Sequence, residues 1–192
     1  MSEFWNQKHR ANSKLWLTCT KPEEVFQIHG IQLPAPGTRI LDIGIGNGDM
    51  HRYLFALGCD VWSEDISLVA LKKVRPGRGI QESEIHLHGP WDLVLCHLVL
   101  QHMSDKQIKR LLSQIYLTKT GIMSLQFAEL LDSRIESPWP NHFFRSLETM
   151  ERIVLDTGFR IQWIRNPTDW PWEGEIVRWW VIRVEQLAEG VQ

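Results

Sequence analysis

The sequence predicts one α/β domain in which a mainly parallel sheet is packed between helices. Strand-length apolar runs alternate with segments of helical spacing, and parallel strands need crossover helices of this kind. One run, residues 91–100, is nearly continuously apolar, which is typical of a central strand covered on both faces. The 192 residues contain 43% hydrophobic side chains. This is enough for one sizeable core, and we expect no second domain.

The first elements follow from start and stop signals. Thr20 and Glu23 have capping-box spacing, and Gly30 ends the short helix that they open. Ser67 caps a later helix, which the Pro-Gly pair at 76–77 ends. We expect a helix over residues 20–30, a strand over 38–44, a helix over 48–58, a strand over 59–67 and a helix over 67–74.

The remaining elements alternate in the same way and close with an antiparallel pair. Ser104 and Gln107 form a second capping-box pair, and Ser146 caps a helix that Gly158 ends. A third strand should lie within residues 75–90. We further expect strands over 91–100 and 121–129, helices over 104–115 and 146–158, and a final strand pair over 159–165 and 176–184, joined by a loop that contains Pro, Asp and Gly.

Composition and charge exclude several classes of function. The formal net charge is −2 with interleaved signs, so we expect no nucleic-acid partner, because such binding needs a basic stripe. No apolar run reaches the roughly 20 residues of a membrane span, so we expect no membrane partner. Cys19, Cys59 and Cys96 form no CxxC pair and no signal peptide precedes them, which favours reduced thiols and a cytoplasmic location. His86 and His88 lack a cysteine at metal-ligand spacing, so we expect no metal site.

The stretch RILDIGIGNGDM, residues 39–50, carries the most specific signal. Asp42, Gly44, Gly46 and Gly48 follow a predicted strand, and ligands of parallel sheets bind beyond the carboxyl ends of strands. Position 49 is aspartate, so the dinucleotide fingerprint G-x-G-x-x-G is broken, and no Gly-Lys-Ser/Thr of a P-loop follows. The pattern D-x-G-x-G-x-G instead indicates a backbone that approaches a ligand without a phosphate. An oxidoreductase is therefore disfavoured.

This pattern resembles the first motif of the class I S-adenosylmethionine-dependent methyltransferases. EDIS at 64–67 is similar to their second motif, and WDLVLCHLVLQHM at 91–103 to their fourth strand and its loop. The resemblance covers nearly the whole chain and implies a Rossmann-like three-layer sandwich, with a mostly parallel seven-stranded sheet and a C-terminal antiparallel hairpin. It implies a single domain over residues 1–192, in which 1–30 form a helical leader or lid. The implied cofactor is S-adenosylmethionine, and the protein would be a monomer or a homodimer.

The resemblance also assigns cofactor contacts. The glycine loop would contact the methionine part, with Asp42 ordering the loop and the cofactor amino group. An acid after the second strand would hold the ribose hydroxyls; Asp65 is favoured over Glu64, since neighbouring side chains of a strand face opposite ways. The adenine contact stays open within residues 81–83. The expected cofactor-binding residues are Asp42, Gly44, Gly46, Gly48, Asp65, Ile66, Gln81, Glu82 and His97.

The acceptor would lie beyond the fourth and fifth strands. The candidates for a base that takes its proton are, in this order, His102, His142 and His9. A structural role is the alternative for each of them. The residues expected to orient the acceptor are Trp5, Trp139 and Asn141.

The implied function is transfer of a methyl group from S-adenosylmethionine to a small-molecule acceptor, at oxygen or nitrogen, by in-line displacement. The segment LCHL at 95–98 contains neither Asn/Asp-Pro-Pro-Tyr/Phe nor Pro-Cys, which argues against adenine, glutamine and cytosine C5 as acceptors. The alternative is a non-catalytic cofactor-binding or interaction protein with a methyltransferase fold.

Overall fold

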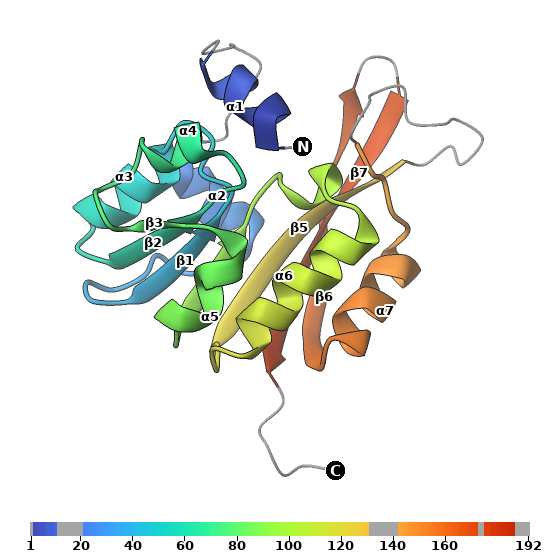
Figure 1. Cartoon of the computed structure of the whole chain (residues 1–192). Coiled ribbons are helices and arrows are strands. Elements are labelled where there is room, and N and C mark those ends of the chain that lie inside the picture. Colours follow the sequence, from blue (N-terminus) through green and yellow to red (C-terminus); the bar gives the residue numbers. More distant parts are fainter. Residues whose placement is uncertain (1, 11–20, 131–141, 173–174, 187–192) are drawn as a thin grey trace.

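The structure is a computed structural model that describes residues 2–10, 21–130, 142–172 and 175–186 (Figure 1). The strands are β1 (Arg39–Ile43), β2 (Asp60–Glu64), β3 (Gly79–Ile80), β4 (Leu93–Cys96), β5 (Ile122–Leu130), β6 (Phe159–Trp172) and β7 (Glu175–Gln186). The α-helices are α1 (Ser2–Arg10), α2 (Pro22–Ile28), α3 (Asp49–Ala56), α4 (Leu68–Leu71), α5 (Ile85–His88), α6 (Asp105–Tyr116) and α7 (Leu147–Asp156). Two 3₁₀ turns complete the description, η2 (Glu82–Glu84) and η3 (Leu100–His102).

All seven strands form one sheet in the order β3-β2-β1-β4-β5-β7-β6. The pairs among β1 to β5 are parallel, whereas β7 runs antiparallel to β5 and β6 antiparallel to β7. Figure 1 shows the helices packed on this sheet and α1 above it. The predicted fold is therefore confirmed, including the closing antiparallel pair.

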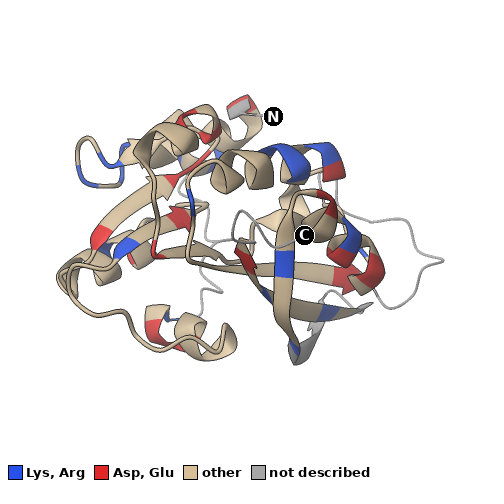
Figure 2. Cartoon of the chain, turned by 90° about the horizontal axis from the view of Figure 1, so that it is seen from below, with Lys and Arg blue, Asp and Glu red and all other residues tan. Residues whose placement is uncertain are grey.

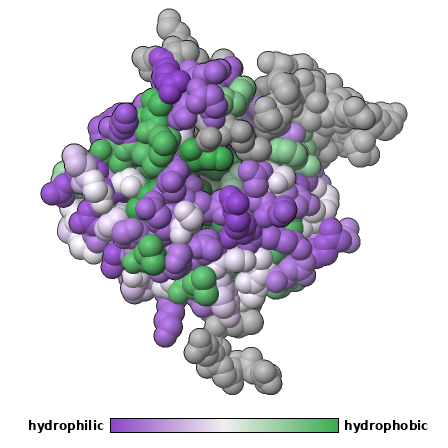
Figure 3. All heavy atoms as spheres, viewed as in Figure 1, coloured by the Kyte–Doolittle hydropathy of each residue, from purple (hydrophilic) through white to green (hydrophobic). Residues whose placement is uncertain are grey.

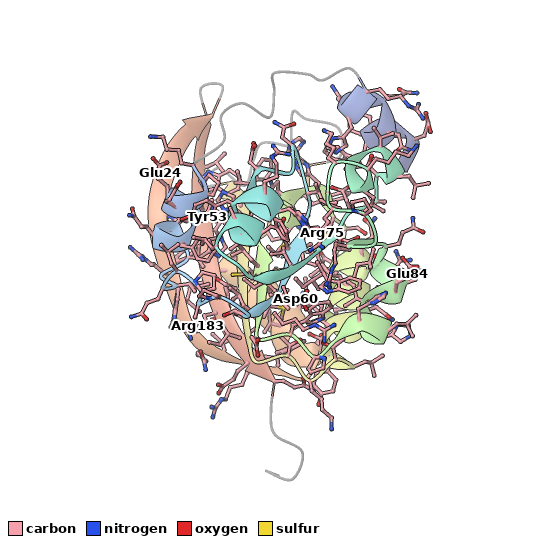
Figure 4. All side chains as sticks on the ribbon, turned by 90° about the vertical axis from the view of Figure 1, so that its left-hand side faces the viewer. Glu24, Tyr53, Asp60, Arg75, Glu84 and Arg183 are labelled. Atoms are coloured by element: carbon pink, nitrogen blue, oxygen red, sulfur yellow. The ribbon has the colours of Figure 1, made fainter. Side chains whose placement is uncertain are left out.

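Two apolar cores lie on opposite faces of the sheet. The larger core joins the sheet to α5, α6 and α7, and the smaller one joins it to α2 and α3. Side chains alternate along a strand, so in β1 Leu41 enters the larger core and Ile40 the smaller one. Figure 4 separates the two sides: Glu24 of α2 and Arg183 of β7 lie on one, Glu84 of η2 on the other. Because β1 and β4 are covered on both faces, their sequences read as continuous apolar runs.

Three predicted helix caps are confirmed. Ser67 Oγ accepts the backbone N–H of Ala70 (3.2 Å) at α4. The Ser104 N–H donates to Gln107 Oε1 (2.9 Å) at α6, as the capping-box spacing predicts. Ser146 Oγ accepts the backbone N–H of Thr149 (3.2 Å) at α7. Polar groups that satisfy the first free N–H groups of a helix thus mark these three starts correctly.

The predicted N-cap of α2 is wrong by one residue, since Lys21 and not Thr20 precedes the helix. The helix begins at Pro22, and the Lys21 N–H donates to the Glu24 carboxylate (3.3 Å). Proline fits the first helical position because its missing N–H would have no partner there. Thr20, the predicted cap, lies outside the described residues.

Several strands differ in length from the prediction. The third strand is only the two residues of β3, and the chain after it coils into η2 and α5. Strand β4 ends at Cys96, because Leu98 takes a positive φ of 56° and turns the chain into η3. Conversely, β6 continues to Trp172 across register shifts near Ile161 and Arg165, where a loop was predicted.

Charged side chains are distributed over the whole described chain. Basic and acidic residues alternate along the ribbon in Figure 2. None of the described helices is long and apolar enough to cross a membrane.

Candidate active site

The loop after β1 opens the site at the carboxyl end of the parallel strands. Its glycines, Gly44, Gly46 and Gly48, have φ values of 81°, 55° and 81°, which side chains other than glycine rarely adopt. A Cβ on Gly44 would lie 2.2 Å from Val99 Cγ2, whereas a Cβ on Gly46 would meet no described residue within 4 Å. Gly44 is therefore required by the packing of the segment after β4. Gly46 is the glycine of this loop whose bare face is open toward a ligand.

Asp65 joins the glycine loop to the end of β2. Its Oδ2 accepts the Ile45 N–H (3.0 Å) and its Oδ1 accepts the Ser67 N–H (2.7 Å). The adjacent Glu64 is the register partner of Ile43, whose side chain enters the larger core on the other face. Of the two acids, Asp65 is the one that lies with the loop, and it remains the candidate for the ribose contact.

The carboxyl groups below the loop are electrostatically unusual. Burial and the nearby charge of Asp65 raise the pKa of Asp42 to about 7, against the lowering effect of a hydrogen bond with Ser63. Burial also raises the pKa of Asp65 to about 6, although bonds from backbone N–H groups lower it. Asp42 Oδ2 has no hydrogen-bond partner among the described residues. A cationic ligand would stabilise both ionised carboxylates, so the site fits the amino group and sulfonium of the expected cofactor.

The residues predicted near the adenine differ in availability. Ile66 follows Asp65 and is 38% exposed, an apolar side chain open to a flat ring. Gln81 follows β3 and is exposed. The Glu82 carboxylate is held by Arg110 through two hydrogen bonds of 2.5 and 2.8 Å. Gln81 is therefore the more available of the two polar candidates.

Helix α1 packs on α4 beside the glycine loop. Asn6 is 8% exposed, and its Oδ1 accepts hydrogen bonds from Ser67 Oγ (2.8 Å) and the Val69 N–H (3.3 Å). Ser67 is also the residue that donates to Asp65. Figure 3 shows hydrophobic residues gathered next to this helix in the upper part of the face. Helix α1 is thus bonded to the segment that follows β2.

His9, one of the three predicted bases, lies in α1. Lys73 Nζ donates to His9 Nδ1 (3.1 Å) and to the carbonyl of Gly46 (3.3 Å). Burial, and then the charge of Lys73, lower the pKa of His9 to about 4. Lys73 thus connects His9 to the glycine loop.

Trp5, His102 and His142 do come together. The ring of Trp5 meets His102 edge-on at 4.9 Å between centroids, and His102 meets His142 at 4.5 Å. Phe144 lies parallel to His142 at 6.3 Å. These four rings come from α1, η3 and the segment before α7, and we call them the aromatic cluster. Two further acceptor candidates lie outside the described residues, namely Trp139 and Asn141.

Arg145 ties the two histidine-bearing segments together, and sequence reasoning missed it. It is 5% exposed. Its guanidinium donates to the Asp105 carboxylate (2.6 Å) and to the carbonyls of Leu100 (3.1 Å), Phe143 (2.8 Å) and Met103. These carbonyls flank His102 on one segment and follow His142 on the other. No sequence motif marks an arginine whose partners are mostly backbone carbonyls.

A second polar group missed from the sequence lies at the end of β4. His29, which follows α2, is fully buried; its Nδ1 is 2.7 Å from Ser124 Oγ and its Nε2 is 3.2 Å from His97 Nδ1. Burial lowers the pKa of His29 to about 3, with a further contribution from His97, and burial lowers the pKa of His97 to about 4. Both imidazoles are therefore neutral at neutral pH.

The sheet order and the glycine loop define an α/β domain of the kind that binds ligands beyond the carboxyl ends of its strands. Comparison with solved structures agrees. The magnesium protoporphyrin IX methyltransferase of Synechocystis PCC 6803 with bound SAM is 17% identical, with a TM-score of 0.66 over 97% of this chain and 95% of that chain. A Haemonchus contortus phosphoethanolamine N-methyltransferase is 16% identical, with a TM-score of 0.64 over 87% of this chain and 52% of that chain. The 4+2 cyclase SpnF is 12% identical, with a TM-score of 0.64 over 87% of this chain and 81% of that chain.

A family model matches the central part of the sequence. Residues 41–121 match the family model described as a methyltransferase domain. This span begins within β1 and includes the glycine loop, Asp65 and η3. A comparison with curated proteins finds no match. Over this span the chain is similar to methyltransferases, and it shares its fold with a methyltransferase solved with bound SAM, the cofactor that the resemblance implies.

Proposed function

We propose that this protein transfers the methyl group of S-adenosylmethionine to a small-molecule acceptor, at oxygen or nitrogen. The proposal is carried by two groups of residues that follow neighbouring strands of the sheet. Asp65 and the glycine loop form one, at the ends of β1 and β2. The aromatic cluster forms the other, and η3, which contributes His102, follows β4, the neighbour of β1 in the sheet.

Different residues would contact the methionine, ribose and nucleobase parts of the cofactor. Asp42 and the open face of Gly46 serve the methionine end, and Asp65 serves the ribose. Ile66 and Gln81 lie where a nucleobase would extend beyond β2 and β3. Asp42 and Asp65 also favour a ligand with positive charge. Burial raises the pKa of both carboxyl groups, and a nearby cation would stabilise their ionised forms.

When bound, S-adenosylmethionine supplies a methyl group on a sulfonium that is already activated for displacement. The protein's main task is then to hold the acceptor atom in line with that methyl group, which can contribute several kcal/mol, about 7–11 in favourable cases. No nucleophilic side chain is required. The buried Cys96, fully covered in the larger core, has a pKa raised well above its usual value by burial and takes no part.

The aromatic cluster would orient an acceptor with an unsaturated or apolar body. Trp5 closes it from α1, so docking of α1 would both cover the cofactor and complete the acceptor wall. His102 can take a proton from the reacting group, since an imidazole can act as a base near neutral pH. His142, in edge contact with it, is the second candidate.

Methyl transfer has to be tested directly, because the fold also occurs in a cyclase. The experiment measures S-adenosylhomocysteine formation by mass spectrometry with a panel of phenols, amines and carboxylic acids. We expect turnover of at least one class. His102→Gln should lower kcat by about 100-fold if His102 is the base, whereas His86→Gln, a substitution of an exposed histidine bonded to Gln114, should not. Cofactor binding without turnover of any panel member would favour the non-catalytic alternative.

A further inference from the structure

A buried polar row crosses the carboxyl ends of β4 and β5 on the side of α2. His29 is bonded to Ser124 of β5 and to His97, which follows the last residue of β4. The bond to His29 orients the His97 ring through its Nδ1 atom, and the bond to Ser124 holds His29 in turn. Its other nitrogen, Nε2, is buried and has no hydrogen-bond partner among the described residues.

Gln126 lies beside His97 in this row. Leu95 is the register partner of Ser124, and Cys96 that of Leu125, so the next positions along β4 and β5 are His97 and Gln126. Alternation along β5 places Gln126 on the same face as Ser124, and therefore on the face of His97. Gln126 is 3% exposed, and its Oε1 also lacks a partner within the described part of the chain.

Two neighbouring buried polar atoms that the fold leaves without hydrogen bonds are unusual. Most such groups in proteins are paired, and an unpaired one costs about 1–3 kcal/mol. The backbone around them is also strained, since Leu98 has a φ of 56° and its carbonyl is held by Gln101 Nε2 (2.7 Å). Strain of this kind concentrates at functional sites. The location, at the carboxyl ends of β4 and β5, is on the edge of the sheet at which ligands of such folds bind.

We propose that His97 Nε2 and Gln126 Oε1 bind the reacting atom of the acceptor and select a primary amine over a hydroxyl. This inference rests on the proposed methyl transfer and reassigns His97, which the sequence placed at the cofactor, to the acceptor. The proposal takes the tautomers in which His97 Nδ1–H donates to His29 Nε2 and His29 Nδ1–H donates to Ser124 Oγ. His97 Nε2 then carries a lone pair. Two facing acceptors cannot bond each other, which agrees with the unpaired state of both atoms.

The selection follows from counting hydrogens. A neutral –NH₂ group can donate one N–H to each of the two atoms, which leaves its lone pair free to attack the methyl group. A hydroxyl has one hydrogen and would leave one buried acceptor unpaired. On transfer, the N–C bond forms, the S–C bond breaks and its electron pair stays on sulfur. The secondary ammonium product keeps its two N–H groups directed at His97 Nε2 and Gln126 Oε1, and it loses one proton to solvent after it leaves the site.

The test uses aniline and phenol, two neutral probes of matched shape with two and one donor hydrogens. The full chain, labelled with ¹⁵N-histidine and saturated with S-adenosylhomocysteine, is titrated with each probe by NMR, and cofactor affinity is measured by calorimetry. We expect His97 Nε2 to resonate as a lone-pair nitrogen, aniline to shift it, and aniline to bind about 5-fold to 150-fold more tightly than phenol. Gln126→Leu should remove most of that preference without changing S-adenosylhomocysteine affinity. His86→Gln serves as the matched control.

Several outcomes would overturn the inference alone. These are a protonated His97 Nε2, equal affinity for the two probes, no response of His97 to either probe, or a loss of S-adenosylhomocysteine affinity in Gln126→Leu. Failure of the wild-type chain to bind S-adenosylhomocysteine would instead overturn the proposed function itself.

Discussion

Two glycines of the β1 loop, Gly44 and Gly46, should respond differently when each is changed to alanine. Gly44→Ala introduces a Cβ at 2.2 Å from Val99 Cγ2 at a φ of 81°. The left-handed backbone costs about 1–2 kcal/mol and the overpacking about 1–3 kcal/mol, so unfolding should become easier by about 2–5 kcal/mol. Gly46→Ala meets no described residue within 4 Å at a φ of 55° and should lose only the first contribution.

Among folded variants, cofactor affinity should fall more in Gly46→Ala than in Gly44→Ala. A methyl group on Gly46 would occupy the open face toward the ligand and should weaken S-adenosylhomocysteine binding about 10-fold or more, equivalent to about 1.4 kcal/mol. Gly37→Ala, at a φ of 84° with no described residue within 4 Å, is the matched control for backbone strain. Urea unfolding and calorimetry measure both quantities. The reasoning is refuted if Gly46→Ala binds as tightly as Gly37→Ala, or if Val99→Ala fails to relieve Gly44→Ala.

Two further predictions concern charge. Asp42 and Asp65 have folded-state pKa values of about 7 and about 6, raised above the unfolded value of about 3.9, so their contribution to stability is present at low pH and is lost as the pH rises through these values. Binding of the cationic cofactor S-adenosylmethionine should strengthen as the pH rises over the same range, by at most about 10-fold per pH unit per group. A calorimetric Kd that is independent of pH would contradict this. So would a Kd whose pH dependence is unaltered by Asp42→Asn. Arg145→Met should lower the free energy of unfolding by about 3 kcal/mol or more, whereas Lys109→Met, which removes an exposed pair with Asp156, should change it by less than about 1 kcal/mol. Equal effects of the two substitutions in urea unfolding would show that Arg145 does not hold its segments together.

The sequence was sufficient for the features that depend on local chemistry. Capping serines, glycine stops and apolar runs predicted the helices and the order of the strands, because these signals act within a few residues. The glycine loop and Asp65 were predicted from a short motif in the same way. Strand lengths were less accurate, since the end of β4 depends on the turn at Leu98 and the extension of β6 on its pairing with β7.

Long-range polar pairs could not be predicted. Arg145 acts through carbonyls about forty residues away, and His29 is bonded to residues 68 and 95 positions further along the chain. Nothing in the local pattern distinguishes such side chains from ordinary surface residues. The motif likewise could not reveal that Gly44 is required by Val99, because that contact exists only once β1 and β4 are paired.

The central claim is that the β1 loop and Asp65 bind S-adenosylmethionine. Isothermal calorimetry of the full chain with S-adenosylmethionine, repeated on Asp65→Ala and on Asp156→Ala as a control at an exposed carboxylate, tests it most directly. We expect saturable binding by the wild type and by Asp156→Ala, and a loss of about 10-fold or more in Asp65→Ala. No binding by the folded wild type at millimolar cofactor, or equal affinities in all three proteins, would contradict it.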